Sequence, residues 1–304
     1  MRSIALFSVT CAVISLVSIS AQAQLALRGE LDRKNYLQYE NIFIKLTMRN
    51  LSGHPLAFGD NPQLKGDLTF EFESPDGKIP EIIDTTYSPL FGQVLEPGET
   101  ESVNVALLKL YRVKTPGKYK IRAIIRHSQL ADKYQSNSMD FSVTTGMKVW
   151  GTPVGIPSIR DSMSDDEKIK TRNYKIVTFY DGLDKIYSLI VEDDKFIYGI
   201  ARVGFDIGNG PPFREIDRMS KIHILSQAGP SVYSYYVYDI NCNLEGKEVY
   251  VASKASVPIL VRDPKAGTVV LAGGKKGVLG VDFVEVEGKP KINDDIELLK
   301  QPSP

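Results

Sequence analysis

The chain has 304 residues and carries 37 basic and 37 acidic side chains, so its formal net charge is zero. A balanced charge provides no general attraction to nucleic acid or to an anionic lipid surface, and we expect neither as a partner. Two cysteines are present, too few for the disulfide framework that stabilises small secreted domains. The length is that of a folded protein with about two domains.

The first 23 residues have the three parts of a secretory signal peptide. A cationic start precedes a mostly apolar run over residues 4–19, and the small-x-small sequence Ala-Gln-Ala ends at Ala23. We expect cleavage there, a mature chain that begins at Gln24, and a secreted or periplasmic location. An uncleaved membrane anchor is the alternative interpretation. No later apolar run approaches the length that a membrane-spanning helix needs, so no transmembrane segment is expected after cleavage.

Cleavage would also remove Cys11 and leave Cys242 as the last cysteine of the mature chain. No intramolecular disulfide is then expected, which fits a bacterial envelope better than an animal extracellular space. Cys242 lies at a predicted turn, where it is an exposed reactive thiol, a thiol that pairs between chains, or a tolerated free thiol. We favour the tolerated thiol, because no histidine lies near it in the sequence to activate it.

The mature chain divides by composition into two β-rich parts, residues 24–145 and residues 173–288. Between them, residues 146–172 contain a Gly- and Pro-rich stretch followed by polar residues, which predicts a linker with one short helix. Residues 289–304 form a polar tail that we expect to be frayed. The predicted class is therefore all-β with two domains.

Alternation of apolar and polar residues predicts the strands of the N-terminal part. No stretch there has convincing helical periodicity, and the number and spacing of strands are typical of a β-sandwich. The predicted strands span residues 42–48, 68–72, 102–113, 118–126 and 137–144.

Two Pro-Gly motifs flank the late strands of this part: residues 96–99 read Glu-Pro-Gly-Glu, and residues 115–121 read Thr-Pro-Gly-Lys-Tyr-Lys-Ile. Over residues 25–145 this pattern resembles bacterial immunoglobulin-like domains of envelope proteins. The resemblance implies an immunoglobulin-like sandwich and a tyrosine corner, in which the hydroxyl of Tyr119 bonds back to the backbone. It concerns fold and not activity, and Trp150 lies beyond the last strand, outside the place of the antibody-type tryptophan.

The C-terminal part is also predicted to consist of strands joined largely by short turns. The first three form a meander, and Gly-rich residues 273–277 are interpreted as a hairpin turn. The segment is too short for a propeller, so we expect a second β-sandwich or a small β-barrel. The predicted strands span residues 174–180, 185–191, 196–205, 222–226, 232–240, 248–252, 258–261, 268–271 and 278–286.

The sequence contains no recognisable catalytic or metal-binding motif. His54, His127 and His223 are the three histidines, and none has a histidine or cysteine at metal-ligand spacing. No Gly-x-Ser-x-Gly elbow and no Asp-x-Asp-x-Asp-Gly calcium loop occurs. We therefore expect no cofactor and no enzymatic activity, although carboxylates that converge only in the fold stay open as an alternative.

One predicted strand is unusually aromatic, with Tyr233, Tyr235, Tyr236 and Tyr238. Strand alternation would place the first two on one face and the other two on the opposite face. An exposed pair would stack on sugar rings or anchor a protein partner, which makes these residues candidates for ligand binding. Core and cross-strand packing is the favoured alternative, because tyrosine is a good strand former.

These observations favour an exported, non-catalytic binding or structural protein of the cell envelope or extracellular space. Its expected partner is an envelope protein or a polysaccharide. The alternatives are a carrier of a small apolar ligand in a C-terminal barrel, a secreted hydrolase whose carboxylates converge only in the fold, and a protease inhibitor built on the immunoglobulin-like module.

Overall fold

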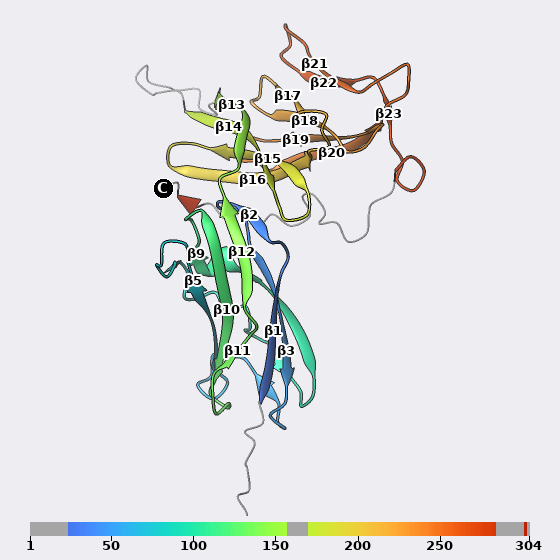
Figure 1. Ribbon diagram of the computed structural model, residues 1–304. Helices are drawn as coiled ribbons and strands as arrows, with labels where there is room; N and C mark the ends of the chain where they lie inside the picture. The colour runs from blue at the N-terminus through green and yellow to red at the C-terminus, as the bar shows by residue number, and fades with distance from the viewer. Residues whose placement is uncertain (1–23, 157–169, 284–300, 303–304) are drawn as a thin grey trace, which may run out of the picture.

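The computed structural model describes residues 24–156, 170–283 and 301–302 (Figure 1). The expectation of an all-β protein is confirmed: among the described residues the one helix is a single turn, α1 (Leu107–Leu110). Residues 1–23, the predicted signal peptide, and residues 157–169 of the predicted linker, where its short helix is expected, lie outside the described residues.

The N-terminal half contains two main sheets. The first has the strand order β1-β3-β8, and in the second β12 pairs in parallel with β2, while β5 pairs with the long strand β10. Its strands are β1 (Leu25–Leu31), β2 (Asn35–Leu37), β3 (Phe43–Asn50), β5 (Gly66–Glu73), β8 (Thr100–Ala106), β10 (Gly117–His127), β11 (Tyr134–Gln135) and β12 (Met139–Thr144). Two short pairs join β4 (Leu56–Ala57) to β7 (Val94–Leu95) and β6 (Glu81–Ile82) to β9 (Tyr111–Arg112).

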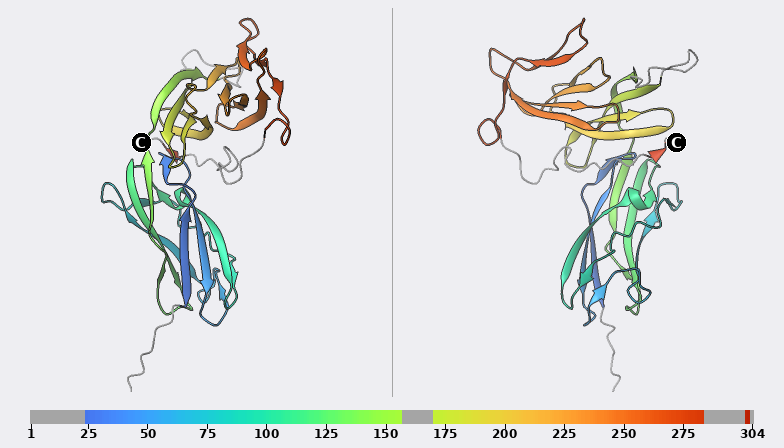
Figure 2. Two further views of the ribbon diagram at one scale, coloured as in Figure 1. Left: turned by 45° about the vertical axis from the view of Figure 1, so that its right-hand side comes forward. Right: turned by 180° about the vertical axis from the view of Figure 1, so that it is seen from behind.

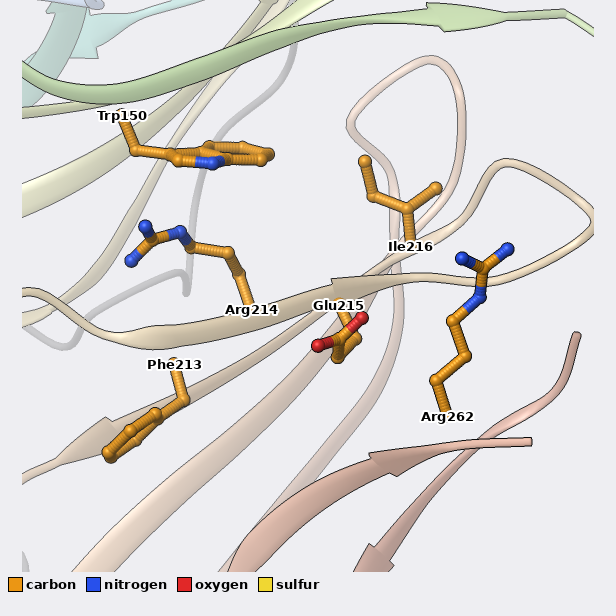
Figure 3. A pocket seen from close by; sticks show the side chains of 6 residues that line it. All are labelled: Trp150, Phe213, Arg214, Glu215, Ile216 and Arg262. Carbon is orange, nitrogen blue, oxygen red and sulfur yellow. The ribbon is translucent and has the colours of Figure 1, made fainter. Parts of the chain in front are cut away.

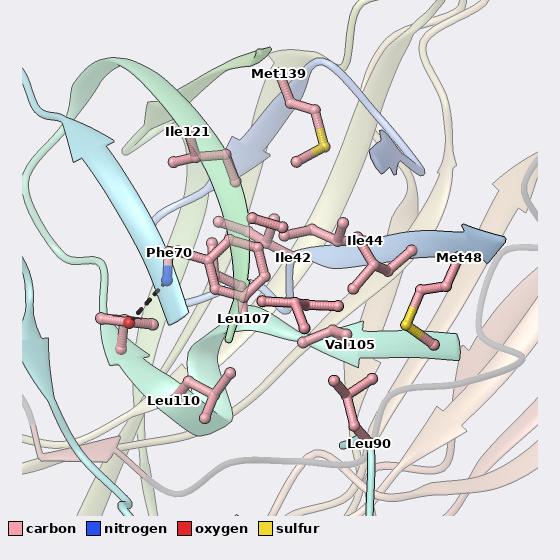
Figure 4. Close-up of a cluster of buried hydrophobic side chains, with 14 of the residues drawn as sticks. Ile42, Ile44, Met48, Phe70, Leu90, Val105, Leu107, Leu110, Ile121 and Met139 are labelled. Carbon is pink, nitrogen blue, oxygen red and sulfur yellow. Dashed lines mark hydrogen bonds between the residues drawn. The ribbon is translucent and has the colours of Figure 1, made fainter. Parts of the chain in front are cut away.

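Strand alternation creates one core between these two sheets (Figure 4). In β3 the side chains of Ile44 and Met48 are fully buried while Lys45 is exposed, and in β10 Ile121 is buried while Arg122 is exposed. Residues of both sheets belong to the same cluster of buried hydrophobic side chains. Each fully buried aliphatic side chain contributes about 1.5–3 kcal/mol, so this half has a substantial core of its own.

The predicted strand over residues 102–113 is interrupted. It ends as β8 at Ala106, continues as the helical turn α1, and resumes as the short strand β9. Leu107, Leu108 and Leu110 are all buried, which strict strand alternation would not allow for two adjacent residues. The helical turn therefore turns adjacent leucines toward the core.

Tyr119 lies near the start of β10 and is 3% exposed. Its hydroxyl donates a hydrogen bond to the carbonyl oxygen of Thr115 at 2.7 Å. Its ring is stacked on Phe141, with the ring centroids 5.1 Å apart. The side chain thus ties the start of β10 to the loop that precedes it.

The C-terminal half contains two five-stranded sheets, with the orders β13-β14-β15-β16-β24 and β17-β18-β19-β20-β23, and a separate hairpin, β21–β22. The first sheet contains β13 (Met147–Gly155), β14 (Thr171–Tyr180), β15 (Lys185–Glu192), β16 (Phe196–Phe205) and β24 (Gln301–Pro302). The second contains β17 (Phe213–Ile216), β18 (Ile222–Gln227), β19 (Val232–Tyr238), β20 (Leu244–Val251) and β23 (Lys275–Lys276), and the hairpin contains β21 (Ile259–Arg262) and β22 (Val269–Ala272).

The segment assigned to a linker, residues 146–172, is strand over much of its described length. Met147–Gly155 form β13, which runs antiparallel to β14. The glycines and Pro153 that suggested a linker are compatible with a strand here because β13 is the end strand of its sheet, where a missing backbone donor is tolerated.

Three other segments near the C-terminus differ from the prediction. Residues 278–283, predicted to be a strand, form a turn with one isolated bridge, because Gly280 has a positive φ of 81° and the Asp282 carboxylate accepts the N–H of Val278. The Gly-rich segment leads into β23, which pairs with β20 instead of closing a hairpin with β22. Gln301–Pro302 of the tail pair with β16 as β24, while the rest of residues 289–304 lies outside the described residues.

The two five-stranded sheets share a second buried cluster, to which Tyr174, Leu189, Ile224, Tyr236 and Tyr238 belong. The sheets come closest where β16 meets β18. A Cβ atom at Gly204 would collide with the side chain of Ser226, so the residue at position 204 must lack a side chain.

The two halves meet through β2 and the residues that follow it (Figure 2). Leu37, only 1% exposed, belongs to a third cluster whose other buried members lie on β14, β15 and β16. Those members are Val177, Phe179, Ile186, Ile190, Ile197 and Ile200.

A buried ionic network lies beside this cluster. The Arg202 guanidinium donates to Glu40 of the N-terminal half at 2.7 Å and to Asp181 of its own half at 2.8 Å. Glu40 also accepts hydrogen bonds from the Leu37 backbone at 2.9 Å and from Arg33 at 3.2 Å. The side chains of Arg202 and Glu40 are each 5% exposed, so neither can be solvated if the other is lost.

We predict that Glu40→Ala destabilises the protein strongly. The change leaves Arg202 buried with one carboxylate partner in place of two, and breaking a buried ion pair costs about 3–5 kcal/mol. The free energy of unfolding in urea measures the effect. The control is Glu30→Ala, whose pair with Arg28 is exposed and should contribute less than about 1 kcal/mol. Equal losses for the two variants would contradict the assigned role of Glu40.

We predict that protonation of Asp181 in acid lowers the folding stability of the protein. Burial alone would raise the pKa of its carboxyl, but the backbone N–H groups of Asp184 and Leu183 and the Arg202 guanidinium outweigh burial, so the pKa lies below 3.8. A lowered folded pKa contributes stability that is present above the unfolded value and is lost as the pH falls through the folded value.

Asp181→Asn should therefore unfold more easily than the wild type at about pH 7, and the difference should shrink toward about pH 3. Urea unfolding of both proteins at the two pH values measures this. A difference that is independent of pH would show that the Asp181 charge does not contribute.

Candidate functional site

A pocket of about 460 Å³ lies at the edge of the C-terminal half (Figure 3). Three strands line it: β13 contributes Trp150, β17 contributes all four of its residues, and β21 contributes Arg262. Both β13 and β17 are end strands of their sheets. The pocket thus forms beside two end strands that belong to different sheets and do not pair with each other.

A bulge in β13 directs Trp150 toward the pocket. The pairing of β13 with β14 shifts between Lys148 and Trp150, which leaves Val149 as an extra residue. Consecutive residues of a regular strand point to opposite faces, yet Val149 and Trp150 both pack against the core cluster of this half. Bulges characteristically redirect a side chain in this way.

Arg214 lies against the Trp150 ring, with its Cζ atom 5.1 Å from the ring centroid. The guanidinium also donates to the carbonyl oxygen of Pro212 at 3.0 Å. Burial lowers the pKa of Arg214 and the Glu215 carboxylate partly offsets this, and an arginine remains ionised at neutral pH. Both contacts hold the cation in one place before any ligand arrives.

The four side chains of β17 alternate between the two sides of the strand. Arg214 and Ile216 project to the side of Trp150, while Phe213 and Glu215 project to the other side (Figure 3). Phe213 is 63% exposed. Arg262 reaches the pocket from β21, and neither pocket arginine forms an ion pair with a carboxylate among the described residues. The lining therefore offers two cations, one carboxylate and two aromatic rings.

The four tyrosines of β19 lie elsewhere. Tyr236 and Tyr238 belong to the core cluster, and Tyr233 is 8% exposed. Tyr235 is half-buried, and its hydroxyl lies 2.6 Å from Nδ1 of His223. Alternation is as predicted, with Tyr236 and Tyr238 together on the core side, but three of the four rings are packed within the protein.

Tyr235 belongs to a small polar cluster on the outer face of the second sheet. Burial, followed by the effects of Tyr250 and Glu248, raises the pKa of Tyr235 to about 12, so its hydroxyl stays protonated at neutral pH. His223 is 7% exposed, and its Nε2 atom lies 3.4 Å from the Asp217 carboxylate. These contacts satisfy the buried imidazole, which is the ordinary structural role of such a histidine.

The other histidines also have local partners. Nδ1 of His127 accepts the N–H of Gln129, so Nε2 donates to the carbonyl oxygen of Ala57 at 2.9 Å. His54 lies 3.2 Å from the carbonyl oxygen of Ser52. In the part of the chain that the structure describes, no group of three or more His, Cys, Asp or Glu side chains is arranged to hold a metal ion.

Cys242 is not an exposed thiol. It is 5% exposed within the core cluster, at a turn position with φ of 63°. Burial, with a smaller contribution from Asp239, raises the pKa of the thiol well above its usual range. The interpretation of Cys242 as an exposed, reactive residue is therefore wrong, because the turn that carries it folds inward.

Comparison with known proteins gives no relative: no protein-family model matches the chain, and no curated protein sequence matches it significantly. No helix among residues 24–156, 170–283 and 301–302 is long and apolar enough to cross a membrane.

Sequence reasoning did not select Trp150, Arg214 or Arg262. The one available signal was that Trp150 is the single tryptophan of the chain and lies in a segment assigned to a linker. The bulge that directs it, and the convergence of three strands on one pocket, are long-range features with no local pattern.

We predict that Cys242 is protected from thiol reagents in the folded protein. A buried thiol with a raised pKa supplies almost no accessible thiolate, so modification should require unfolding. Reaction of the chain from Gln24 onward with an aromatic disulfide reagent, in buffer and in urea, measures the protection. The control is Ala255→Cys in a Cys242→Ala background, because position 255 is exposed. Equal rates for Cys242 and the control in buffer would refute the prediction.

Proposed function

We propose that the chain is an exported, non-catalytic binding protein of the cell envelope or extracellular space, and that the pocket binds an anionic group of its ligand. One observation carries the proposal. Two guanidinium groups, on Arg214 and Arg262, line a hollow beside an indole ring without a carboxylate partner among the described residues.

Guanidinium groups recognise carboxylates, sulfates and phosphates through paired N–H donors. Arg214 is already held against Trp150 and by Pro212, so binding would order few additional side-chain rotamers. Trp150 and Phe213 add apolar surface beside the charge. Such a combination of a few placed polar groups with aromatic side chains is typical of ligand sites.

The described geometry gives less support to the other candidate functions. Glycoside hydrolysis uses a pair of carboxylates, whereas Glu215 is the one carboxylate in the pocket lining. A barrel carrier would keep its interior for a ligand, whereas Tyr174, Tyr236 and Tyr238 occupy the space between the two sheets.

We further propose that the N-terminal half is an immunoglobulin-like sandwich that serves as a structural module. The core that its two sheets share and the backbone bond of Tyr119 support this. The buried pair of Arg202 and Glu40 would then hold the binding half in a constant orientation on the module.

Retention on immobilised polymers tests the proposal. The chain from Gln24 onward should be retained by polyglutamate or polygalacturonate but not by neutral dextran. Arg262→Glu should weaken retention about tenfold or more, because it places a like charge against the anion. Arg122→Glu is the matched control, since Arg122 is exposed on β10 of the other half.

Two results would overturn the proposal. One is equal retention of Arg262→Glu and the control on an anionic polymer, which would place binding elsewhere. The other is a failure of the wild-type chain to bind any anionic polymer.

A further inference from the structure

The strand that lines most of the pocket has an open edge, meaning an edge with which no described strand pairs, and β21 lies close to this strand without pairing with it. β17 pairs with β18 on one side, and among the described residues no strand pairs with its other side. An unpaired strand edge presents backbone N–H and C=O groups that another extended chain can bind.

The hairpin between β17 and β18 determines which backbone groups are free. The Asp217 N–H donates to the carbonyl of Lys221 at 3.0 Å, and the Ser220 N–H donates to the carbonyl of Asp217 at 3.1 Å. Asp217 therefore directs its backbone groups toward β18. Since antiparallel bonding alternates from residue to residue, Arg214 and Ile216 direct theirs to the open edge.

The residues at this edge limit where pairing can occur. The next residue toward the N-terminus whose backbone groups point to the open edge is Pro212, which has no N–H to donate. The free donors are thus those of Arg214 and Ile216, two residues apart, with a spacing of about 6.5–7 Å along the strand. This spacing matches the repeat of an extended peptide.

Resting on the proposed anion binding, we infer that the ligand is an extended acidic peptide segment of a partner protein, which adds to the open edge of β17 as a strand. The backbone groups of Arg214 and Ile216 pair with the segment. Its acidic side chains bind the Arg214 and Arg262 guanidinium groups, and an apolar side chain contacts Trp150 and Ile216.

Charge and shape both favour this occupant. Arg214 and Arg262 outweigh Glu215 and leave the pocket with one net positive charge. A polysaccharide would satisfy the arginines but carries no alternating ladder of N–H and C=O groups. A peptide satisfies both the side chains and the edge.

The single tryptophan of the chain makes the test direct, because its fluorescence reports on this pocket alone. Three kinds of probe are titrated into the chain from Gln24 onward. The first is a synthetic peptide of valine, threonine and glutamate, and the second is a pair of versions of it, one with the odd-numbered and one with the even-numbered backbone nitrogens methylated. The third is oligogalacturonate. The peptide should bind saturably. One of the two methylated peptides should bind more than about tenfold more weakly than the parent peptide, because methylation of the nitrogens that face β17 removes the backbone hydrogen bonds and keeps the charges.

Variants locate the contacts. Arg262→Ala should weaken peptide binding about tenfold or more, whereas Arg122→Ala, on the exposed surface of β10, should leave it unchanged. Arg262 is exposed, so its substitution is not expected to unfold the protein, and an unchanged urea midpoint verifies this.

The outcomes separate this inference from the proposed function. If both N-methylated peptides bind as well as the parent peptide, or if oligogalacturonate binds and the peptide does not, strand addition is wrong while anion binding stands. If no probe changes the fluorescence or is retained, both proposals fail.

Discussion

The ion pair between Arg202 and Glu40 connects the two halves, and their relative position depends on it. A buried guanidinium that lost one of its two carboxylate partners would remain desolvated and only partly paired, at a cost of several kcal/mol. Glu40 is the carboxylate that the N-terminal half supplies to Arg202. Because Leu37 packs into the C-terminal half beside the pair, apolar burial and charge pairing act on a few residues at the end of β2 and just after it.

The candidate site follows from a second constraint, the free edges of the C-terminal sheets. Packing around Tyr174 and Tyr236 joins the two sheets in one buried cluster, but it leaves β13 and β17 as end strands. The bulge at Val149 then places Trp150 beside Arg214. The pocket is therefore a consequence of how two sheets end, and it does not occupy the interior of either.

Period-two alternation was enough to predict β3, and β-branched and aromatic runs between turn residues were enough to predict the β14–β16 meander, because both patterns are visible in a few consecutive residues. Alternation failed at α1, where adjacent leucines are both buried. The strand β13 was missed because its glycines and proline are typical of a linker. The Glu40–Arg202 pair spans 162 positions, and no local pattern indicates such a contact. The pocket combines residues from three strands, so only tertiary structure brings its two arginines to one tryptophan.

Collisional quenching of Trp150 by iodide and by caesium tests most directly whether a cationic pocket surrounds the indole. Positive charge concentrates anions and repels cations near the ring, and low ionic strength enlarges the difference. Neutral acrylamide measures accessibility alone. A cationic pocket should make iodide quench Trp150 more strongly than caesium does, and Arg262→Ala should reduce the difference. Quenching by caesium equal to or stronger than that by iodide would contradict a cationic site at this pocket.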